Sequence, residues 1–217
     1  QIEEVRGRVK ISSSTLIGQR YLLPQLCAFN REYPQVVVEV SLNDAVVDLV
    51  GEGFDLALRV GELPDSSLVA KKIGEKSWAT FASPEYLDEM GCPSHPSDVT
   101  SHRCVIFKNA QFDQRLWSFA DAQGNTIQCN IHENFSADDG RTVIDMAVMG
   151  QGLVRVDPIL IEPELSEGKL VPVLQDWSHM NASSIHLVAL SKQARNRAVQ
   201  ALWAFLGDNL NVGISQD

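Results

Sequence analysis

The chain has 217 residues, 44% hydrophobic and 21% charged, and its 28 acidic against 18 basic side chains give a formal net charge of −10. This composition excludes an intrinsically disordered protein, and the length is sufficient for one or two domains with an ordinary buried core. Nucleic-acid binding through phosphate contacts requires clustered Lys and Arg, which this acidic chain lacks. We therefore do not expect these residues to bind nucleic acid by themselves.

The spacing of cysteines and histidines argues against a metal site. No two of the four cysteines form a C-x-x-C pair and no two of the five histidines form an H-x-x-x-H pair, so we expect no metal and no cofactor. No apolar run approaches the roughly 18 residues that span a bilayer, and no signal peptide is recognisable. We expect a reduced, cytoplasmic protein without membrane contact, and, because it starts at Gln1 rather than Met, part of a longer one.

The first sixty residues predict the order β-α-β-α-β, which is typical of a parallel sheet flanked by helices. Alternating and β-branched runs indicate the strands, and apolar residues at helical spacing up to Pro34 indicate the first helix. The expected elements are a strand at 9–12, a helix at 16–33, a strand at 36–40, a short helix at 46–50 and a strand at 54–60.

The rest of the chain predicts further α/β structure. The expected elements are strands at 68–73, 78–82, 105–107, 170–173 and 185–190, a hairpin of 116–120 and 127–132, and helices at 83–90, from about 142, at 158–164 and at 193–206, with 91–103 as loop containing a short helical turn. Segments 47–56 and 144–154 share one pattern, apolar-Asp, helix, Gly-x-Gly and strand. The match is either chance or a sign of two lobes built on one plan.

A cluster of hydroxyl residues, Ser12 to Thr15, joins the first strand to the first helix. Hydroxyls and free backbone N–H groups at a helix N-terminus can bind a carboxylate, sulfonate or phosphate. Ordinary helix capping needs only one of these side chains and is the alternative interpretation.

Three further positions are candidates for binding. Arg59 lies late in a strand before Gly61, where a guanidinium could clamp an acidic group, or pair with Asp55 or Asp157. Ala137 and Asp138 could cap a second helix facing a cleft, or the acidic residues there could simply favour the helix dipole. Asp157 before Pro158 repeats the arrangement of a strand end followed by a helix.

A catalytic set is not apparent. The G-x-S-x-G motif is absent, the single S-x-x-K at 166–169 lies in a predicted turn, and the glycine pairs 51/53 and 150/152 follow helices and lack the third glycine of a dinucleotide loop.

From about Gly7 to Leu206 the chain resembles the effector-binding domain of LysR-type transcriptional regulators. The order and spacing of several segments carry this resemblance: 7–15, 23–34, 36–40, 48–61 with its D-x-A-x-R-x-G pattern, Ser-Pro-Glu-Tyr-Leu at 83–87, and 150–153. The resemblance implies an α/β fold of two Rossmann-like lobes, similar to type 2 periplasmic binding proteins. Residues 1–77 with 188–217 would form the first lobe and 78–187 the second, joined by crossover strands at 78–83 and 185–190.

The resemblance also implies where an effector binds, namely in a cleft between the lobes. The implied ligand-binding residues are Ser13, Ser14, Thr15, Arg59 and Gly61 from the first lobe, and Phe107, Phe135, Ala137, Asp138 and Asp157 from the second lobe or the hinge. Asp157 departs from the family, which often has Leu-Pro there. Its carboxylate would favour a ligand amine or hydroxyl, or neutralise Arg59 or Arg155.

Three functions follow as hypotheses. The favoured one is a sensor that binds a small, polar or anionic effector and controls DNA binding through an N-terminal winged helix-turn-helix absent from these residues, with 1–6 as the end of its linker. The resemblance also implies a homodimer or tetramer, in which 16–33 and 36–40 would contact their counterparts. A solute-binding protein of a transport system is the alternative, and an enzyme on the same scaffold would lack a catalytic set.

Overall fold

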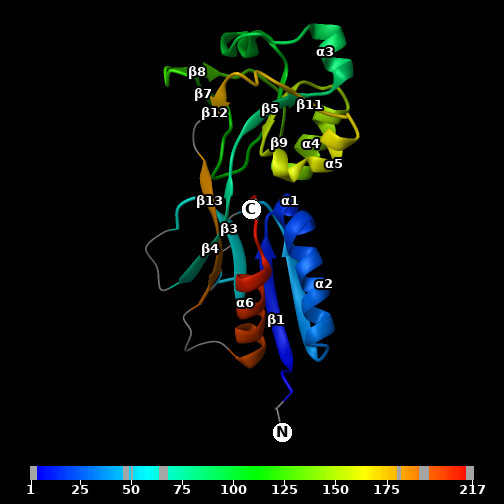
Figure 1. The fold of residues 1–217 in the computed structure, drawn as a ribbon, viewed down its shortest axis with the longest axis vertical. Helices are drawn as coiled ribbons and strands as arrows, with labels where there is room; N and C mark the ends of the chain where they lie inside the picture. The colour runs from blue at the N-terminus through cyan, green and yellow to red at the C-terminus, as the bar shows by residue number, and fades with distance from the viewer. Residues whose placement is uncertain are drawn as a thin grey trace. The chain divides into compact units, whose positions relative to one another are not determined.

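The computed structural model describes residues 4–45, 49, 51–63, 68–179, 182–190 and 196–213. The chain divides into two compact units, the first formed by Gln1–Lys76 with Ser183–Asp217 and the second by Ser77–Ala182. The polypeptide therefore passes twice between them, after 76 and after 182 (Figure 1).

The first unit contains a five-stranded sheet in the order β2-β1-β3-β13-β4. Its strands are β1 (Gly7–Ser13), β2 (Val36–Leu42), β3 (Leu56–Val60), β4 (Val69–Lys76) and β13 (Ser183–Ala189). β1 runs parallel to β2 and β3, whereas β13 is antiparallel to β3 and β4. The predicted parallel sheet is thus confirmed for the first three strands.

The expected first helix is present as a continuous run with a widened turn in its middle: α1 (Thr15–Ile17), the π-helical η1 (Gly18–Leu22) and α2 (Leu23–Glu32). Pro24 has no N–H to donate to the carbonyl four residues earlier, and at this point the Leu23 N–H donates to the carbonyl of Gly18. A side chain at Gly18 would meet the Leu42 side chain of β2, so the chain packs closely against that residue there.

The core of the first unit lies between this helix, the sheet and α6 (Arg197–Asn209), as Figure 1 shows. Ala198, Leu202 and Leu206 of α6 are buried, and the ring of Phe29 packs edge-on against that of Phe205 with centroids 5.4 Å apart. The helix predicted at 193–206 begins at Arg197, capped by Asn196, and residues 193–195 lie outside the described residues. Of the helix predicted at 46–50, only residue 49 is described, as part of a turn.

The second unit contains two sheets, with strand orders β11-β5-β10-β6-β9 and β12-β7-β8. The strands are β5 (Ala79–Ala82), β6 (Cys104–Phe107), β7 (Leu116–Ala120), β8 (Thr126–Asn130), β9 (Glu133–Ala137), β10 (Leu153–Val156), β11 (Val171–Val173) and β12 (Ser178–His179). β6, β9 and β10 are parallel, and β5 is antiparallel to β10. The hairpin predicted around 123–125 is confirmed as β7 and β8.

The helices of the second unit are α3 (Pro84–Met90), η2 (Pro96–Ser101), α4 (Gly140–Val148), η3 (Pro158–Leu160) and α5 (Glu162–Ser166). One core cluster joins Tyr86 of α3 to Trp117 and Phe119 of β7 and to Ile106 of β6, all fully buried. The single helix expected at 158–164 is wrong, because Ile161 leaves helical geometry at φ −124° and separates η3 from α5.

Of the two Gly-x-Gly segments, 47–56 and 144–154, the second depends on its glycines for its backbone geometry. Gly150 follows α4 with φ +75°, and at Gly152 a Cβ would approach the Arg103 carbonyl oxygen to 2.5 Å. Only glycine permits this close return of the chain to the sheet. In the first segment the positive φ belongs to Gly53, at +67°, where a Cβ would meet open space.

Candidate functional site

The first five predicted ligand-binding residues gather at one edge of the first unit's sheet. β1 and β3 are parallel, with Ile11 opposite Leu56 and Ser12 opposite Ala57, so both strands end at the same edge. Ser13, Ser14 and Thr15 leave β1 there, and Arg59 and Gly61 lie at the end of β3. The carboxyl edge of a parallel sheet is where α/β proteins generally bind ligands.

Ser13 is the most unusual of these residues. It is 0% exposed, and its hydroxyl finds no hydrogen-bond partner within the described residues. Leaving a buried hydroxyl unpaired costs about 1–3 kcal/mol, so such groups are normally satisfied by a protein group, a water or a ligand. Ser14 occupies the N-cap position of α1 without a side-chain capping bond, so the capping interpretation accounts for neither hydroxyl.

The sequence did not single out Asp44, whose carboxylate changes the charge of this edge. The Thr15 N–H, first of the free donors at the helix start, donates to the Asp44 carboxylate at 2.8 Å. The chain thus supplies an anion of its own to the predicted anion site. The available signal was Asn43-Asp44 shortly after the strand predicted at 36–40, since such residues commonly cap turns and helices.

Arg59 lies half-buried opposite His186 of β13. Burial lowers the pKa of Arg59 while the charge of Glu52 raises it, and the guanidinium remains charged. Of the two acids considered as its partners, Asp55 accepts a hydrogen bond from the Lys10 N–H at 2.8 Å. Gly61 adopts φ +95°, and its N–H donates to the Ser184 carbonyl at 2.9 Å, which joins the end of β3 to β13.

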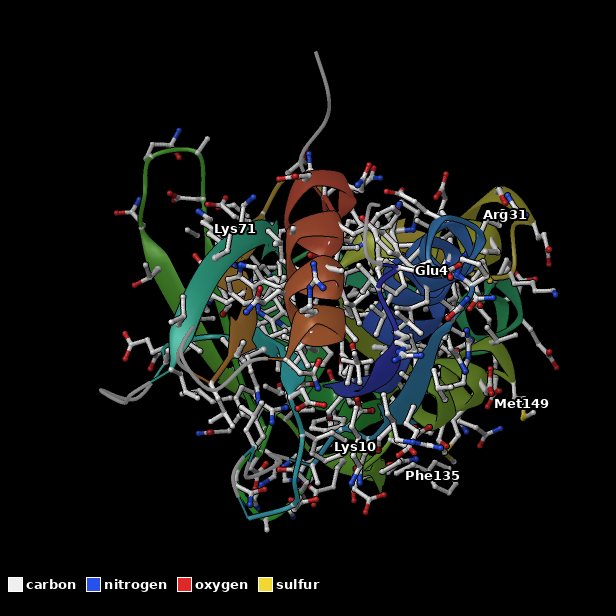
Figure 2. The ribbon with its side chains drawn as sticks, turned by 90° about the horizontal axis from the view of Figure 1, so that it is seen from below. Glu4, Lys10, Arg31, Lys71, Phe135 and Met149 are labelled. Atoms are coloured by element: carbon white, nitrogen blue, oxygen red, sulfur yellow. The ribbon has the colours of Figure 1, made fainter. Side chains whose placement is uncertain are left out.

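The other five predicted residues gather at the corresponding edge of the second unit's sheet. Phe107 at the end of β6 lies opposite Ala137 at the end of β9, and Asp138 follows directly. β10 is parallel to β6, so Asp157 emerges at the same edge. Phe135 lies two residues earlier in β9 and is 40% exposed (Figure 2).

Asp157 is buried and its carboxylate is engaged by the backbone. It is 1% exposed, and it accepts hydrogen bonds from the N–H groups of Ser77 and Ile159. Ser77 is the first residue of the second unit, so this carboxylate fastens the end of β10 to the incoming chain. Beside it, the Arg155 guanidinium stacks 4.8 Å from the Trp78 ring centre, and burial lowers the pKa of Arg155 to about 10.

The expectation that Ala137 and Asp138 cap a helix is wrong by one residue. Asp139 is the N-cap of α4, and its carboxylate accepts from the Thr142 N–H at 2.7 Å and from the Thr142 hydroxyl at 2.8 Å. Asp138 is exposed beside it, still at the carboxyl edge. A sequence alone could not decide between two adjacent aspartates, since either can cap a helix.

Within the described residues, no group of three or more His, Cys, Asp or Glu side chains could hold a metal ion. In the same part of the chain, no helix is both long and apolar enough to cross a bilayer. The structure contains two candidate binding surfaces. Each is the edge of one unit's sheet, where the ends of parallel strands carry polar groups.

The comparisons with known proteins agree with this arrangement. The family model "LysR substrate binding domain" matches residues 3–211. The regulator CrgA of Neisseria meningitidis serogroup B is 28% identical over 94% of this chain and 68% of its own length. An uncharacterised HTH-type regulator of Haemophilus influenzae is 32% identical over 85% of this chain and 63% of its own length.

Solved structures show the same likeness. The CrgA regulatory domain superimposes with a TM-score of 0.84 at 28% identity, over 95% of this chain and 100% of that one. Full-length AphB, a virulence activator of Vibrio cholerae, does so with a TM-score of 0.81 at 28% identity, over 93% of this chain and 68% of that one. The fold is therefore that of regulatory domains with two α/β lobes resembling periplasmic binding proteins. The chain belongs to the LysR substrate-binding domain family.

Proposed function

We propose that this chain is the effector-sensing part of a LysR-type transcriptional regulator and acts by binding a small polar or anionic molecule, without catalysis. The observation that carries the proposal is the family match over residues 3–211, together with the ten predicted residues lying near the carboxyl ends of parallel strands, five in each unit. A transport solute-binding protein shares the fold but is less well supported, because the relatives described above are regulators.

The proposed effector contacts differ between the two edges. In the first unit, the buried Ser13 hydroxyl, the helix start at Ser14 and Thr15, and Arg59 suit an anionic or hydroxylated group. In the second unit, Phe107, Phe135 and the Ala137–Asp138 turn supply apolar surface and one exposed carboxylate. Asp157 contributes by holding the strand end in place.

Signalling would follow from differential binding. An effector changes the regulator only if it binds one arrangement of the protein more tightly than another, and the difference in binding free energy sets the size of the shift.

In this proposal the regulator is cytoplasmic, and a separate, upstream domain contacts DNA. The chain spans only 68% and 63% of the two relatives described, and its net charge is −10.

A homodimer is part of the proposal, formed through the first helix and the β2 edge. β2 is the outermost strand of its sheet, and Val37 and Val40 are 50% and 40% exposed along it. Leu23 of α2 is 37% exposed. Exposed apolar side chains on an open sheet edge are the kind of surface that a second copy covers.

The experiment that tests the proposal is a thermal-shift screen of small carboxylates, aromatic acids and amino acids on the 217-residue chain, repeated on Ser14→Ala and Arg59→Ala. Compounds that bind the carboxyl edge should stabilise the parent and lose most of that effect in both variants. Hits that stabilise the variants as much as the parent would place the site elsewhere. A lipoprotein signal upstream of Gln1, in place of a helix-turn-helix, would favour the transport alternative.

A further inference from the structure

The chain crosses between the two units from one end of a single pair of strands. Lys76, the last residue of β4, lies opposite Ser183, the first residue of β13. The two crossings differ in length. On the way out, Ser77 already belongs to the second unit. On the way back, three residues, 180–182, separate β12 of the second unit from β13 of the first. The outward crossing is therefore the shorter one.

Asp157 binds this crossing at its first residue. Its Oδ2 atom accepts a hydrogen bond from the N–H of Ser77, which lies 80 residues earlier in the chain. Its Oδ1 atom accepts from the N–H of Ile159 at 3.0 Å and so caps η3. Each carboxylate oxygen thus has a donor of its own. Hydrogen bonds to an ionised acceptor are stronger than those between neutral groups, so the N–H of Ser77 is firmly held.

The next two residues of the crossing are held from the same strand. The Arg155 guanidinium of β10 lies 4.8 Å from the centre of the Trp78 ring, and Arg155 is only 7% exposed. A cation over an aromatic ring is attracted more strongly where water is excluded. Ala79 then begins β5 and pairs with Val156 of β10. The end of β10 therefore fixes three successive residues of the incoming chain, 77–79.

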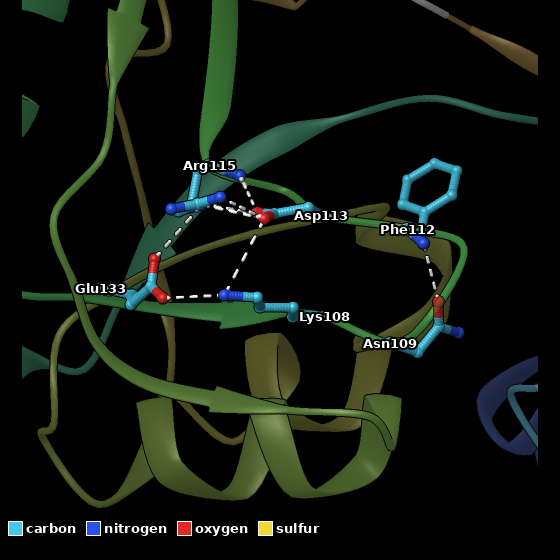
Figure 3. Close-up of polar contacts among 6 residues, drawn as sticks. All are labelled: Lys108, Asn109, Phe112, Asp113, Arg115 and Glu133. Atoms are coloured by element: carbon cyan, nitrogen blue, oxygen red, sulfur yellow. Dashed lines mark hydrogen bonds and ion pairs between the residues drawn. The ribbon is translucent and has the colours of Figure 1, made fainter.

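Asp157 differs from the acids at the surface of the same unit. Asp113 and Glu133 form ion pairs with Arg115 and Lys108 at 2.7 and 3.2 Å (Figure 3). These four side chains are partly exposed, and ion pairs of that kind contribute little to stability. Asp157 is 1% exposed. A buried carboxylate is unfavourable unless its hydrogen bonds are made, so the two backbone donors and this carboxylate depend on one another.

We propose that Asp157 is a positioning residue of the hinge, and that it places the pivot between the units at the Lys76–Ser77 peptide. Residues 77–79 move with the second unit, whereas Lys76 is paired with Ser183 in the first. A change in the angle between the units must then be absorbed by the backbone torsions at this peptide. Leucine, which the family often has in place of Asp157, offers no acceptor for the bond. The restraint acts with or without an effector, and so goes beyond the proposed function.

Hydrogen exchange at the Ser77 amide measures the restraint directly. Asp157→Ser keeps a hydroxyl that can cap η3 at Ile159 but is too short to reach Ser77. Exchange at Ser77 should become about ten- to a hundredfold faster, as expected for the loss of a hydrogen bond to a charged acceptor. Asp139→Ser is the matched control, because Asp139 caps α4 of the same unit through Thr142. It should leave exchange at Ser77 unchanged.

The two exposed cysteines report the consequence for the hinge. Cys27 lies in the first unit and Cys92 in the second, and the other two cysteines are buried. Nitroxide labels on the exposed pair give the distribution of distances between the units by pulsed electron spin resonance. A large excess of unlabelled protein removes distances between neighbouring molecules. The distribution should broaden in Asp157→Ser and remain as in the parent in Asp139→Ser.

Unfolding curves establish that each variant is folded. Asp157→Asn takes the place of the serine variant if that one does not fold, since its carboxamide keeps the native size but offers one acceptor oxygen to two N–H groups. Unchanged exchange at Ser77 overturns the proposal. An unchanged distance distribution in a variant whose Ser77 amide exchanges faster also overturns it. Neither measurement involves an effector, so failure of this proposal leaves the proposed function standing.

Discussion

Asp44 illustrates how one side chain alters the chemistry of a predicted site. Its carboxylate accepts the Thr15 N–H at the start of the first helix, where positive potential would otherwise favour an external anion. An arriving carboxylate must share this end of the helix with a fixed negative charge. The protein is therefore expected to bind anions less tightly than the bare helix start would.

We predict that Asp44→Asn strengthens the binding of any carboxylate found in the thermal-shift screen. Asparagine keeps an acceptor oxygen for Thr15 but removes the charge, so affinity should rise about two- to fivefold. Titration calorimetry measures the change, and a neutral ligand such as the corresponding amide is the control, since it should bind both proteins alike. Equal affinity of the carboxylate for parent and variant would contradict this role of Asp44.

The cysteines offer a second test at the same scale. Cys27 and Cys92 are exposed, whereas Cys104 and Cys129 are buried. Burial raises the pKa of Cys104 to about 12 and also raises that of Cys129, so neither forms the reactive thiolate near neutral pH. A thiol reagent should label two of the four cysteines rapidly in the native protein and the other two only after denaturation. Rapid labelling of all four would show that the second unit's core is open.

At the scale of elements, the start of α4 depends on one of two neighbouring aspartates. We predict that Asp139→Ala destabilises the protein by about 1 kcal/mol, because the Thr142 N–H loses its acceptor. Asp138→Ala, one residue away and exposed, should change the free energy of unfolding by less than about 0.5 kcal/mol. Urea denaturation of the two variants measures both changes in the free energy of unfolding. Equal changes would contradict the role of Asp139 as the helix cap.

Pattern reasoning located most elements because their signals are local. The β-branched run at 36–40, the hairpin glycine at 124 and Pro84 after Ser83 each determine the structure of their own segment. The elements that the sequence patterns failed to predict depend instead on their contacts with other parts of the fold. β9 has an exposed, weakly apolar sequence and is a strand because it pairs with β6, and the break at Ile161 joins two short helical turns that read as one.

The candidate site was predictable in outline and not in detail. Strand-end positions such as Ser13, Arg59 and Phe107 follow from the order of strands and from the family resemblance. The partners of Asp44 and Asp157 depend on contacts between residues distant in the chain. No local pattern in the sequence encodes those contacts.

At the scale of the whole molecule, the proposed homodimer can be tested directly. We predict that light scattering of the concentrated protein shows a dimer and that Val40→Lys, which places a charge on the exposed β2 edge, shifts it to monomers. Met149→Lys is the control, because Met149 is 68% exposed in the other unit, beyond the proposed interface. A parent that stays monomeric at high concentration would remove the dimer from the proposal.

The net charge of the chain also bears on the function of the whole molecule. A net charge of −10 disfavours direct contact of these residues with DNA, and the longer relatives are HTH-type regulators. In the proposed regulator, sensing and DNA contact are divided between separate parts of one polypeptide. The acidic part would then influence DNA only through the arrangement it imposes on its neighbour.

A small effector is proposed to bind at the carboxyl edge of the first unit's sheet, and Ser13 tests this proposal most directly. The measurement is the thermal shift given by a screened carboxylate to the parent, to Ser13→Ala and to Ser118→Ala, a buried serine of β7 that serves as control. We predict that the ligand-induced shift is retained in Ser118→Ala and largely lost in Ser13→Ala, whose unligated stability should not fall. An undiminished shift in Ser13→Ala would contradict the account.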